Sequence, residues 1–254
     1  TQFAGAIFDG EYVWFIPTEA KDIIRLDSSG TMTVYDSWPQ DVTFPANAFR
    51  GGVMAGNSIY IVPHAADAVV VLDCETGNMT TIQNWPEGFT KSGKNFTGGI
   101  FDGEYVYLIP NGAFPIVKIN HNTKAMAVTA PLPEDVPENA RFAGGTFDGR
   151  FIWLSPLAGQ TIVKYDIYNN TSQSFSLTES EADESYLSGA FGDGAVWFSP
   201  FTAPAVLRID GDNTPPTVMN IFLTTTPNTP VGGEMTASDP DEGDTITFSI
   251  VSQP

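Results

Sequence analysis

The sequence is poor in cysteine and in positive charge, and it has no long apolar run; each shortage excludes a class of protein. One cysteine, Cys74, stands among 254 residues, so no disulfide can form within the chain. Eleven lysines and arginines face 30 aspartates and glutamates, which gives a formal net charge of −19. Such a surface repels phosphate backbones, so we expect no nucleic-acid partner. Because no apolar run approaches the roughly 20 residues of a spanning helix, we expect no membrane insertion.

The composition is that of a packed globular protein, and it fits a secreted one. Charged residues make up 16% of the chain and aromatic residues 12%, which is typical of a globular fold rather than an acidic disordered segment. No signal peptide is present, and the chain begins at "TQFAGA", inside a motif that recurs downstream. With little cysteine and lysine, this predicts a trimmed or mature product located outside the cell or on its surface.

One motif recurs five times. It first reads "FAGAIFDGEYVWFIP" at residues 3–17, and later copies start near residues 49, 96, 142 and 186. Subtracting each start from the next gives spacings of 46, 47, 46 and 44 residues. Every copy closes this stretch on a proline: Pro17, Pro63, Pro110, Pro156 and Pro200. A period of this length indicates a repeat architecture.

Each copy predicts four short strands. In the first copy they are residues 3–8, 12–17, 22–27 and 31–36, separated by turns such as Asp-Gly, which suits tight hairpins. Repeated four-stranded units without helices are typical of β-propellers. The copies resemble kelch and WD-like blades in length and in their glycine pair, although they lack the Trp-Asp ending. We therefore predict an all-β fold, a five-bladed β-propeller of four-stranded antiparallel blades over residues 1–212.

The repeated small and large residues have a structural interpretation. Glycines of the first strand let the inner strands crowd around the propeller axis. The aromatic residues that close the first strand are expected to fill the wedge between neighbouring blades: Phe8, Phe101, Phe147 and Phe191.

The fifth copy lacks a convincing fourth strand after "AVLRID". The segment "PTVMNI", residues upstream of the chain, or a neighbouring molecule are the alternatives for completing it. Further blades upstream are a fourth possibility.

Residues 213–254 resemble the start of a bacterial cadherin-like repeat. The resemblance rests on "NTPP", "TPVGGEMTASDPDEGD" and "TITFSI". It implies an incomplete cadherin/Ig-like β-sandwich whose strands pair with the propeller, with a protein partner or with other copies of the chain. It also implies Ca²⁺ at Asp239, Asp241 and Asp244, whose carboxylates are hard oxygen ligands. An acidic turn without metal is the alternative, and we expect no organic cofactor.

Catalysis is not expected. The inner strands carry no Asp or Glu for acid–base work, the two histidines occupy non-equivalent positions, and no G-x-S-x-G elbow is present. Loops 2–3 and 4–1 share one face, which we call the loop face, and their sequences vary between copies. Variable loops on a rigid scaffold favour ligand binding.

The candidate ligand-binding residues all come from these loops and the strand starts beside them: Trp38, Trp85, Arg50, Lys94, His64 and Asn111. The indoles could instead pack on blade edges, and the basic residues could neutralise nearby carboxylates. We predict a non-catalytic extracellular module for adhesion or assembly, with the tail linking to further modules or subunits. A carbohydrate-binding propeller and a polysaccharide hydrolase or lyase are the alternatives.

Overall fold

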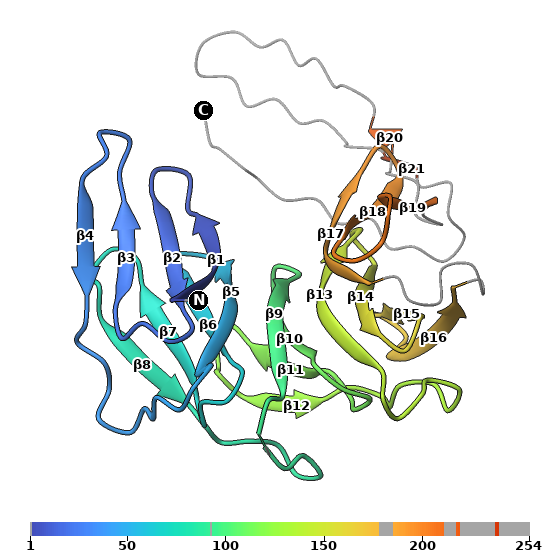
Figure 1. The fold of residues 1–254 in the computed structure, drawn as a ribbon, viewed down its shortest axis with the longest axis horizontal. Helices are drawn as coiled ribbons and strands as arrows, with labels where there is room; N and C mark the ends of the chain where they lie inside the picture. Colours follow the sequence, from blue (N-terminus) through green and yellow to red (C-terminus); the bar gives the residue numbers. More distant parts are fainter. Residues whose placement is uncertain (1, 92, 178–184, 211–216, 219–236, 239–254) are drawn as a thin grey trace, which may run out of the picture.

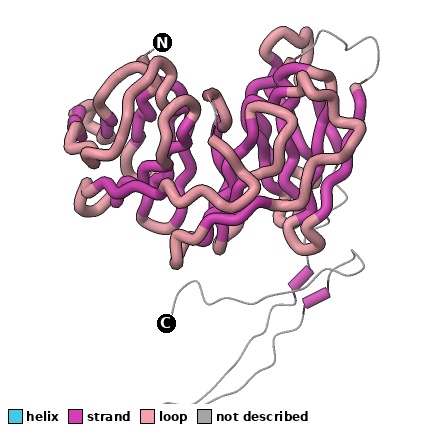
Figure 2. The backbone as a smooth tube through the Cα atoms, turned by 90° about the horizontal axis from the view of Figure 1, so that it is seen from below, coloured by secondary structure: helices cyan, strands magenta, loops and turns pink. Residues whose placement is uncertain are grey.

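The computed structural model describes residues 2–91, 93–177, 185–210, 217–218 and 237–238. Strands and loops account for all of these residues (Figures 1 and 2). In this described part, no helix has the length and apolarity needed to cross a membrane.

Five antiparallel sheets follow one another along the chain, and we call them blades 1 to 5. Blade 1 contains β1 (Phe3–Phe8), β2 (Val13–Pro17), β3 (Ile23–Leu26) and β4 (Met32–Tyr35). Blade 2 contains β5 (Phe49–Ala55), β6 (Ser58–Pro63), β7 (Val69–Asp73) and β8 (Met79–Ile82). Blade 3 contains β9 (Phe96–Phe101), β10 (Tyr105–Pro110), β11 (Val117–Asn120) and β12 (Met126–Val128). Blade 4 contains β13 (Arg141–Phe147), β14 (Phe151–Ala158), β15 (Thr161–Asp166) and β16 (Thr171–Ser176). Blade 5 contains β17 (Tyr186–Gly192), β18 (Ala195–Pro200) and β19 (Leu207–Asp210).

The Asp-Gly turn between the first two strands also anchors an aromatic side chain. In blade 1, Asp9 Oδ1 accepts hydrogen bonds from the backbone N–H groups of Glu11 and Tyr12, at 2.8 and 2.6 Å. Its other oxygen accepts a bond from the Trp14 indole N–H at 2.6 Å. Asp102 and Asp148 repeat the arrangement with Tyr107 and Trp153. This bond gives the aspartate a structural role beyond the turn itself.

The third residue of each motif sits where successive inner strands converge. A Cβ added to Gly51 would lie 3.3 Å from the Cα of Gly98, and both glycines have positive φ. A larger side chain would therefore push the strands apart and strain the backbone. The predicted role of these glycines is confirmed.

The fourth and fifth residues of the motif form a recurring contact across each blade seam. The fifth residue projects onto the fourth residue of the next blade, where a Cβ would meet it at 3.0 to 3.4 Å. We call the projecting side chain the knob. The four knob and glycine pairs are Ile7 with Gly52, Val53 with Gly99, Ile100 with Gly145, and Thr146 with Gly189.

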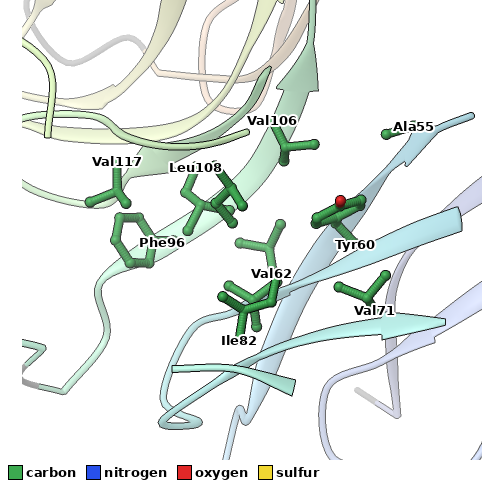
Figure 3. Close-up of a cluster of buried hydrophobic side chains, with 11 residues drawn as sticks. Ala55, Tyr60, Val62, Val71, Ile82, Phe96, Val106, Leu108 and Val117 are labelled. Atoms are coloured by element: carbon green, nitrogen blue, oxygen red, sulfur yellow. The ribbon is translucent and has the colours of Figure 1, made fainter. Parts of the chain in front are cut away.

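The hydrophobic core lies in the seams between blades. Figure 3 shows the seam between blades 2 and 3, where Tyr60 and Val62 face Phe96 and Leu108. All four side chains are fully buried. Burying one such side chain contributes roughly 1.5–3 kcal/mol, so a blade is stabilised mainly by its neighbours.

The five blades form an arc with β1 at one end and β17 at the other (Figure 1). Phe101, Phe147 and Phe191 lie partly buried in seams, as predicted. Phe8 does not: it is 65% exposed, because no described residue precedes blade 1 in the arc. The predicted wedge role of Phe8 is therefore wrong for this structure.

Blade 5 has three strands within the described residues, in keeping with the weak fourth-strand signal. The segment "PTVMNI" does not fill the place as far as it is described, because β20 (Thr217–Val218) pairs with β21 (Ala237–Ser238). Apart from these four residues, the predicted cadherin-like segment 213–254 lies outside the described residues. The same is true of the predicted calcium ligands Asp239, Asp241 and Asp244.

Candidate functional site

A cavity of about 620 Å³ opens at the propeller axis on the loop face. Its wall consists of the second and third residues of all five motifs and the fourth residues of blades 2 to 4. The residues that follow the prolines in blades 4 and 5, Leu157 and Phe201, complete it. Cavities of this size are typical of sites for small ligands or for the tip of a larger one.

Arg50 is the one charged residue among the described residues that line the cavity. It is the second residue of its motif, a position that blades 1 and 4 fill with alanine, and it is exposed. Thr97 holds the same position in blade 3, but its hydroxyl donates to the Phe142 carbonyl at 2.7 Å. The cavity therefore presents one cationic side chain on a wall that is otherwise uncharged and mostly glycine or apolar.

A run of backbone hydrogen bonds joins the loops of the loop face from blade 1 to blade 3. Ala48 N–H donates to the Thr18 carbonyl at 2.9 Å, and His64 N–H donates to the Ala48 carbonyl at 2.9 Å. Asn95 N–H then donates to His64 at 3.0 Å, and Asn111 N–H donates to Asn95 at 2.6 Å. Loops 2–3 and 4–1 are thus joined across blades, which holds this part of the loop face in place.

His64 belongs to this run of hydrogen bonds, but its ring is buried and not available to a ligand. The residue is 2% exposed, and its Nδ1 lies 2.8 Å from the Phe96 carbonyl oxygen, to which it donates. Burial lowers the pKa of His64 to about 4, and the positive charges of Arg50, Lys94 and Lys91 act in the same direction. Three of the chain's 11 basic side chains therefore lie close enough to act on the His64 ring.

Lys91 and Asn111 add polar groups beside His64. The Lys91 ammonium donates to the carbonyls of His64 and Gly93, at 3.2 and 3.1 Å, and burial lowers the pKa of Lys91 to about 8. Asn111 donates from Nδ2 to the Lys94 carbonyl at 3.4 Å. Its buried Oδ1 has no hydrogen-bond partner within the described structure. The structure thus brings Arg50, Lys94, His64 and Asn111 together, as four of the six predicted residues.

The two predicted indoles, in contrast, are engaged in packing. Trp38 stacks on Phe49 with ring centroids 5.4 Å apart, and its N–H donates to the Lys21 carbonyl at 2.6 Å. Trp85 stacks on Phe96 at 5.7 Å and donates to the Asp67 carbonyl. Both are half-buried, and their contacts fasten the long 4–1 loops to the blades. In the structure both indoles pack on the blades, which was the alternative interpretation. A ligand role for them stays a prediction.

Leu157, Phe201 and Thr97 line the cavity but were not among the predicted residues. Alignment of the five copies contained a signal for the two residues that follow prolines, Leu157 and Phe201. The residue after each motif proline reads Thr18, His64, Asn111, Leu157 and Phe201. Reading that column would have placed all five at the axial end of loop 2–3.

The arrangement suits binding of an anion with an apolar portion. No carboxylate or histidine belongs to the described cavity wall, and Arg50 stays protonated, so none of these side-chain types serves there as a general acid or base. Within the described ranges, no three His, Cys, Asp or Glu side chains gather in a way that could hold a metal ion.

Solved structures with the same architecture come from proteins with different roles. The chain is similar to virginiamycin B lyase from Staphylococcus aureus, a catalytically inactive form with quinupristin, with a TM-score of 0.67 and 15% identity over 84% of this chain and 68% of that one. It is also similar to a streptogramin B lyase, with a TM-score of 0.52 and 17% identity over 84% and 82% of the two chains.

A structure of a nidogen/laminin complex matches with a TM-score of 0.60 and 13% identity, over 82% of this chain and 75% of that one. No protein-family model and no curated protein matches this chain. At these identities the likeness concerns the fold alone. With the antiparallel sheets described above, it shows that the chain has a β-propeller fold built from four-stranded blades.

Proposed function

We propose that the chain is a non-catalytic binding module of an extracellular or cell-surface protein, and that its loop face holds an anionic ligand at the axial cavity. The observation that carries this proposal is Arg50, the one charged side chain on the described cavity wall, in a chain with a net charge of −19. Only 11 residues of the chain are Lys or Arg, so a cationic side chain on a cavity wall stands out in it.

Three basic side chains gather near this point of the surface, although the chain as a whole is acidic. Arg50, Lys91 and Lys94 all act on the buried ring of His64. Exposed charges more than about 10 Å apart are screened at ordinary salt, so the distant carboxylates count for little here. A guanidinium can hold a carboxylate or sulfate through two parallel hydrogen bonds, which is the arrangement we assign to Arg50.

The two alternatives require features that the cavity wall does not supply. A polysaccharide hydrolase or lyase needs an acid or base beside the scissile bond, and the described wall has neither a carboxylate nor a histidine. A site for neutral sugars usually presents an open aromatic face, whereas Trp38 and Trp85 are stacked on other rings. Acidic glycans and acidic peptides remain as ligand chemistries that fit.

Calorimetric titration with oligogalacturonate, a neutral oligosaccharide of equal length and an oligoglutamate peptide tests the proposal. We expect binding of an acidic probe that weakens as salt is added. The variant Arg50→Gln should bind at least about tenfold more weakly, because it loses the charge and at least one of the two charge-assisted hydrogen bonds assigned to Arg50. Arg141→Gln is the matched control, because Arg141 is exposed on the same face but does not line the cavity.

Each result has one meaning. Equal loss in Arg50→Gln and Arg141→Gln would show that long-range charge, and not the cavity, draws the probe. Equal binding of the neutral sugar by both variants would favour the carbohydrate-binding alternative. Cleavage of the oligogalacturonate would contradict the non-catalytic proposal.

A further inference from the structure

A β-bulge places the second motif residue of each blade on the wall of the axial cavity. In blade 2 the pairing of β5 with β6 shifts between Phe49 and Gly52, so that Arg50 and Gly51 together face one residue, Val62. Such a bulge bends its strand and redirects a side chain. The same irregularity occurs near the start of the inner strand in all five blades, and all five second residues line the cavity.

The residue types on this wall give the cavity a cationic side and an apolar side. Blade 2 contributes Arg50, whereas blade 4 contributes Leu157 and blade 5 contributes Leu187 and Phe201. In the arc, β9 and β13 stand between β5 and β17 (Figure 1), so the two sides are separated by the inner strands of other blades. Leu187 is 41% exposed and Phe201 is 61% exposed. Burying this apolar surface under a ligand would be favourable.

The other polar side chains of the described wall are already hydrogen-bonded. The Thr97 hydroxyl bonds to the Phe142 carbonyl, and the Ser188 hydroxyl bonds to that of Ser199 at 3.1 Å. Arg50 has no hydrogen-bond or ion-pair partner within the described residues. A ligand covered with hydroxyl groups would therefore depend on backbone groups for most of its hydrogen bonds, and each hydroxyl left unpaired would weaken binding. This favours a ligand with one anionic group and little other polar surface.

We propose that the ligand of the axial cavity is an amphiphilic carboxylate, whose carboxylate binds Arg50 while its apolar group packs on Leu187 and Phe201. This inference rests on the proposed function and names the ligand class for the same cavity. The carboxylate fixes the orientation through charge-assisted hydrogen bonds, and the apolar group adds affinity that does not depend on salt. A peptide that ends in a large apolar residue and a fatty acid both have this chemistry.

Ligand-observed NMR titration with two matched pairs of probes tests the ligand class. One pair is acetyl-Gly-Gly-Leu and acetyl-Gly-Gly-Ala, each with a free carboxylate, and the other is octanoate and acetate. In at least one pair the more apolar member should bind at least about tenfold more tightly, because more carbon atoms are buried. The pair that shows this difference identifies the source as a peptide end or a fatty acid. The C-terminal amide of the leucine peptide should bind more weakly than the free acid.

Two variants separate the two sides of the cavity. Leu187→Asn should weaken binding of the more apolar member about tenfold and leave the shorter member of that pair unchanged. Arg50→Gln should weaken both members. Tyr168→Asn is the matched control, because Tyr168 is 63% exposed in the turn between β15 and β16 and does not line the cavity. Circular dichroism of each variant verifies that it is folded.

Failure of the ligand class and failure of anion binding give different results. If oligogalacturonate or oligoglutamate binds through Arg50 but the members of each pair bind equally, the ligand class is wrong and the proposed function stands. Unchanged binding of every probe by Leu187→Asn would likewise overturn only the ligand class. If no carboxylate binds, or if the leucine peptide and its amide bind equally, Arg50 holds no anion and both proposals are wrong.

Discussion

At the scale of single residues, the same motif position performs different tasks in different blades. The residue after the motif proline is a buried imidazole in blade 2, an amide in blade 3 and an apolar wall residue in blades 4 and 5. The position is fixed by the strand that ends just before it, while the side chain is free to vary. Function in this protein is thus expected in columns of the repeat where the residue types differ.

His64 gives the protein a predictable acid sensitivity. Its pKa is about 4 in the fold and 6.5 in the unfolded chain, so between these values the unfolded chain binds the additional proton. The stability contributed by neutral His64 is complete above pH 6.5 and is lost as the pH falls toward 4. The full loss is about 3 kcal/mol, from a difference of about 2.5 pKa units at 1.36 kcal/mol per unit.

Urea unfolding of wild type and His64→Gln at pH 7.5 and pH 5 measures this effect. The difference in unfolding free energy between the two proteins should shrink at pH 5, because only wild type loses the contribution. Taking the difference cancels the carboxylates that both proteins share. A difference that stays constant with pH would contradict the prediction.

At the scale of elements, the knob contact controls how closely blades approach. A Cβ on Gly99 would meet Val53 Cγ1 at 3.0 Å and the Tyr107 carbonyl oxygen at 3.3 Å. Gly99→Ala should therefore lower the free energy of unfolding by about 1–3 kcal/mol through overpacking. Denaturant titration measures the change.

Gly192→Ala is the control for that change. Gly192 also lies in an inner strand, without a positive φ and with nothing within 4 Å of an added Cβ. Its replacement should leave stability within about 0.5 kcal/mol of wild type. Combining Gly99→Ala with Val53→Ala should reduce the penalty attributable to the new Cβ, as a double-mutant cycle would show. If Gly99→Ala is as stable as wild type, the seam is looser than described.

The strand positions could largely be predicted from the sequence, because strand and turn signals are local. The first strand was predicted at residues 3–8 and β1 spans Phe3–Phe8; the fourth was predicted at residues 31–36 and β4 spans Met32–Tyr35. The candidate site was harder to predict. The burial of His64 depends on the Phe96 carbonyl 32 residues away, and the stacking of Trp38 depends on Phe49. Such contacts between blades have no signature in either local sequence.

At the scale of the whole molecule, 30 acidic residues against 11 basic ones make self-repulsion a general destabilising force. Raising NaCl from about 20 mM to about 300 mM shortens the screening length and should raise the melting temperature by a few degrees. Calorimetry checks this directly. A melting temperature that falls with salt would mean that attractive ion pairs dominate instead.

The calcium prediction for Asp239, Asp241 and Asp244 can be tested in the same experiment. If these carboxylates bind Ca²⁺, CaCl₂ should stabilise the protein more than MgCl₂ at equal ionic strength, and a chelator should reverse the gain. Asp241→Asn should abolish the difference between the two cations. If CaCl₂ and MgCl₂ stabilise the protein equally, the effect is charge screening and the calcium prediction is wrong.

The knob contact also makes the two faces of each blade different, and duplication of a whole copy preserves this difference. Each copy of the motif carries its knob on one face and its receiving residue on the other, so an in-phase duplication of 46 residues supplies both halves of a new seam at once. A gene encoding this chain can therefore gain or lose whole blades without redesigning those that remain, while the loops between them are free to diverge.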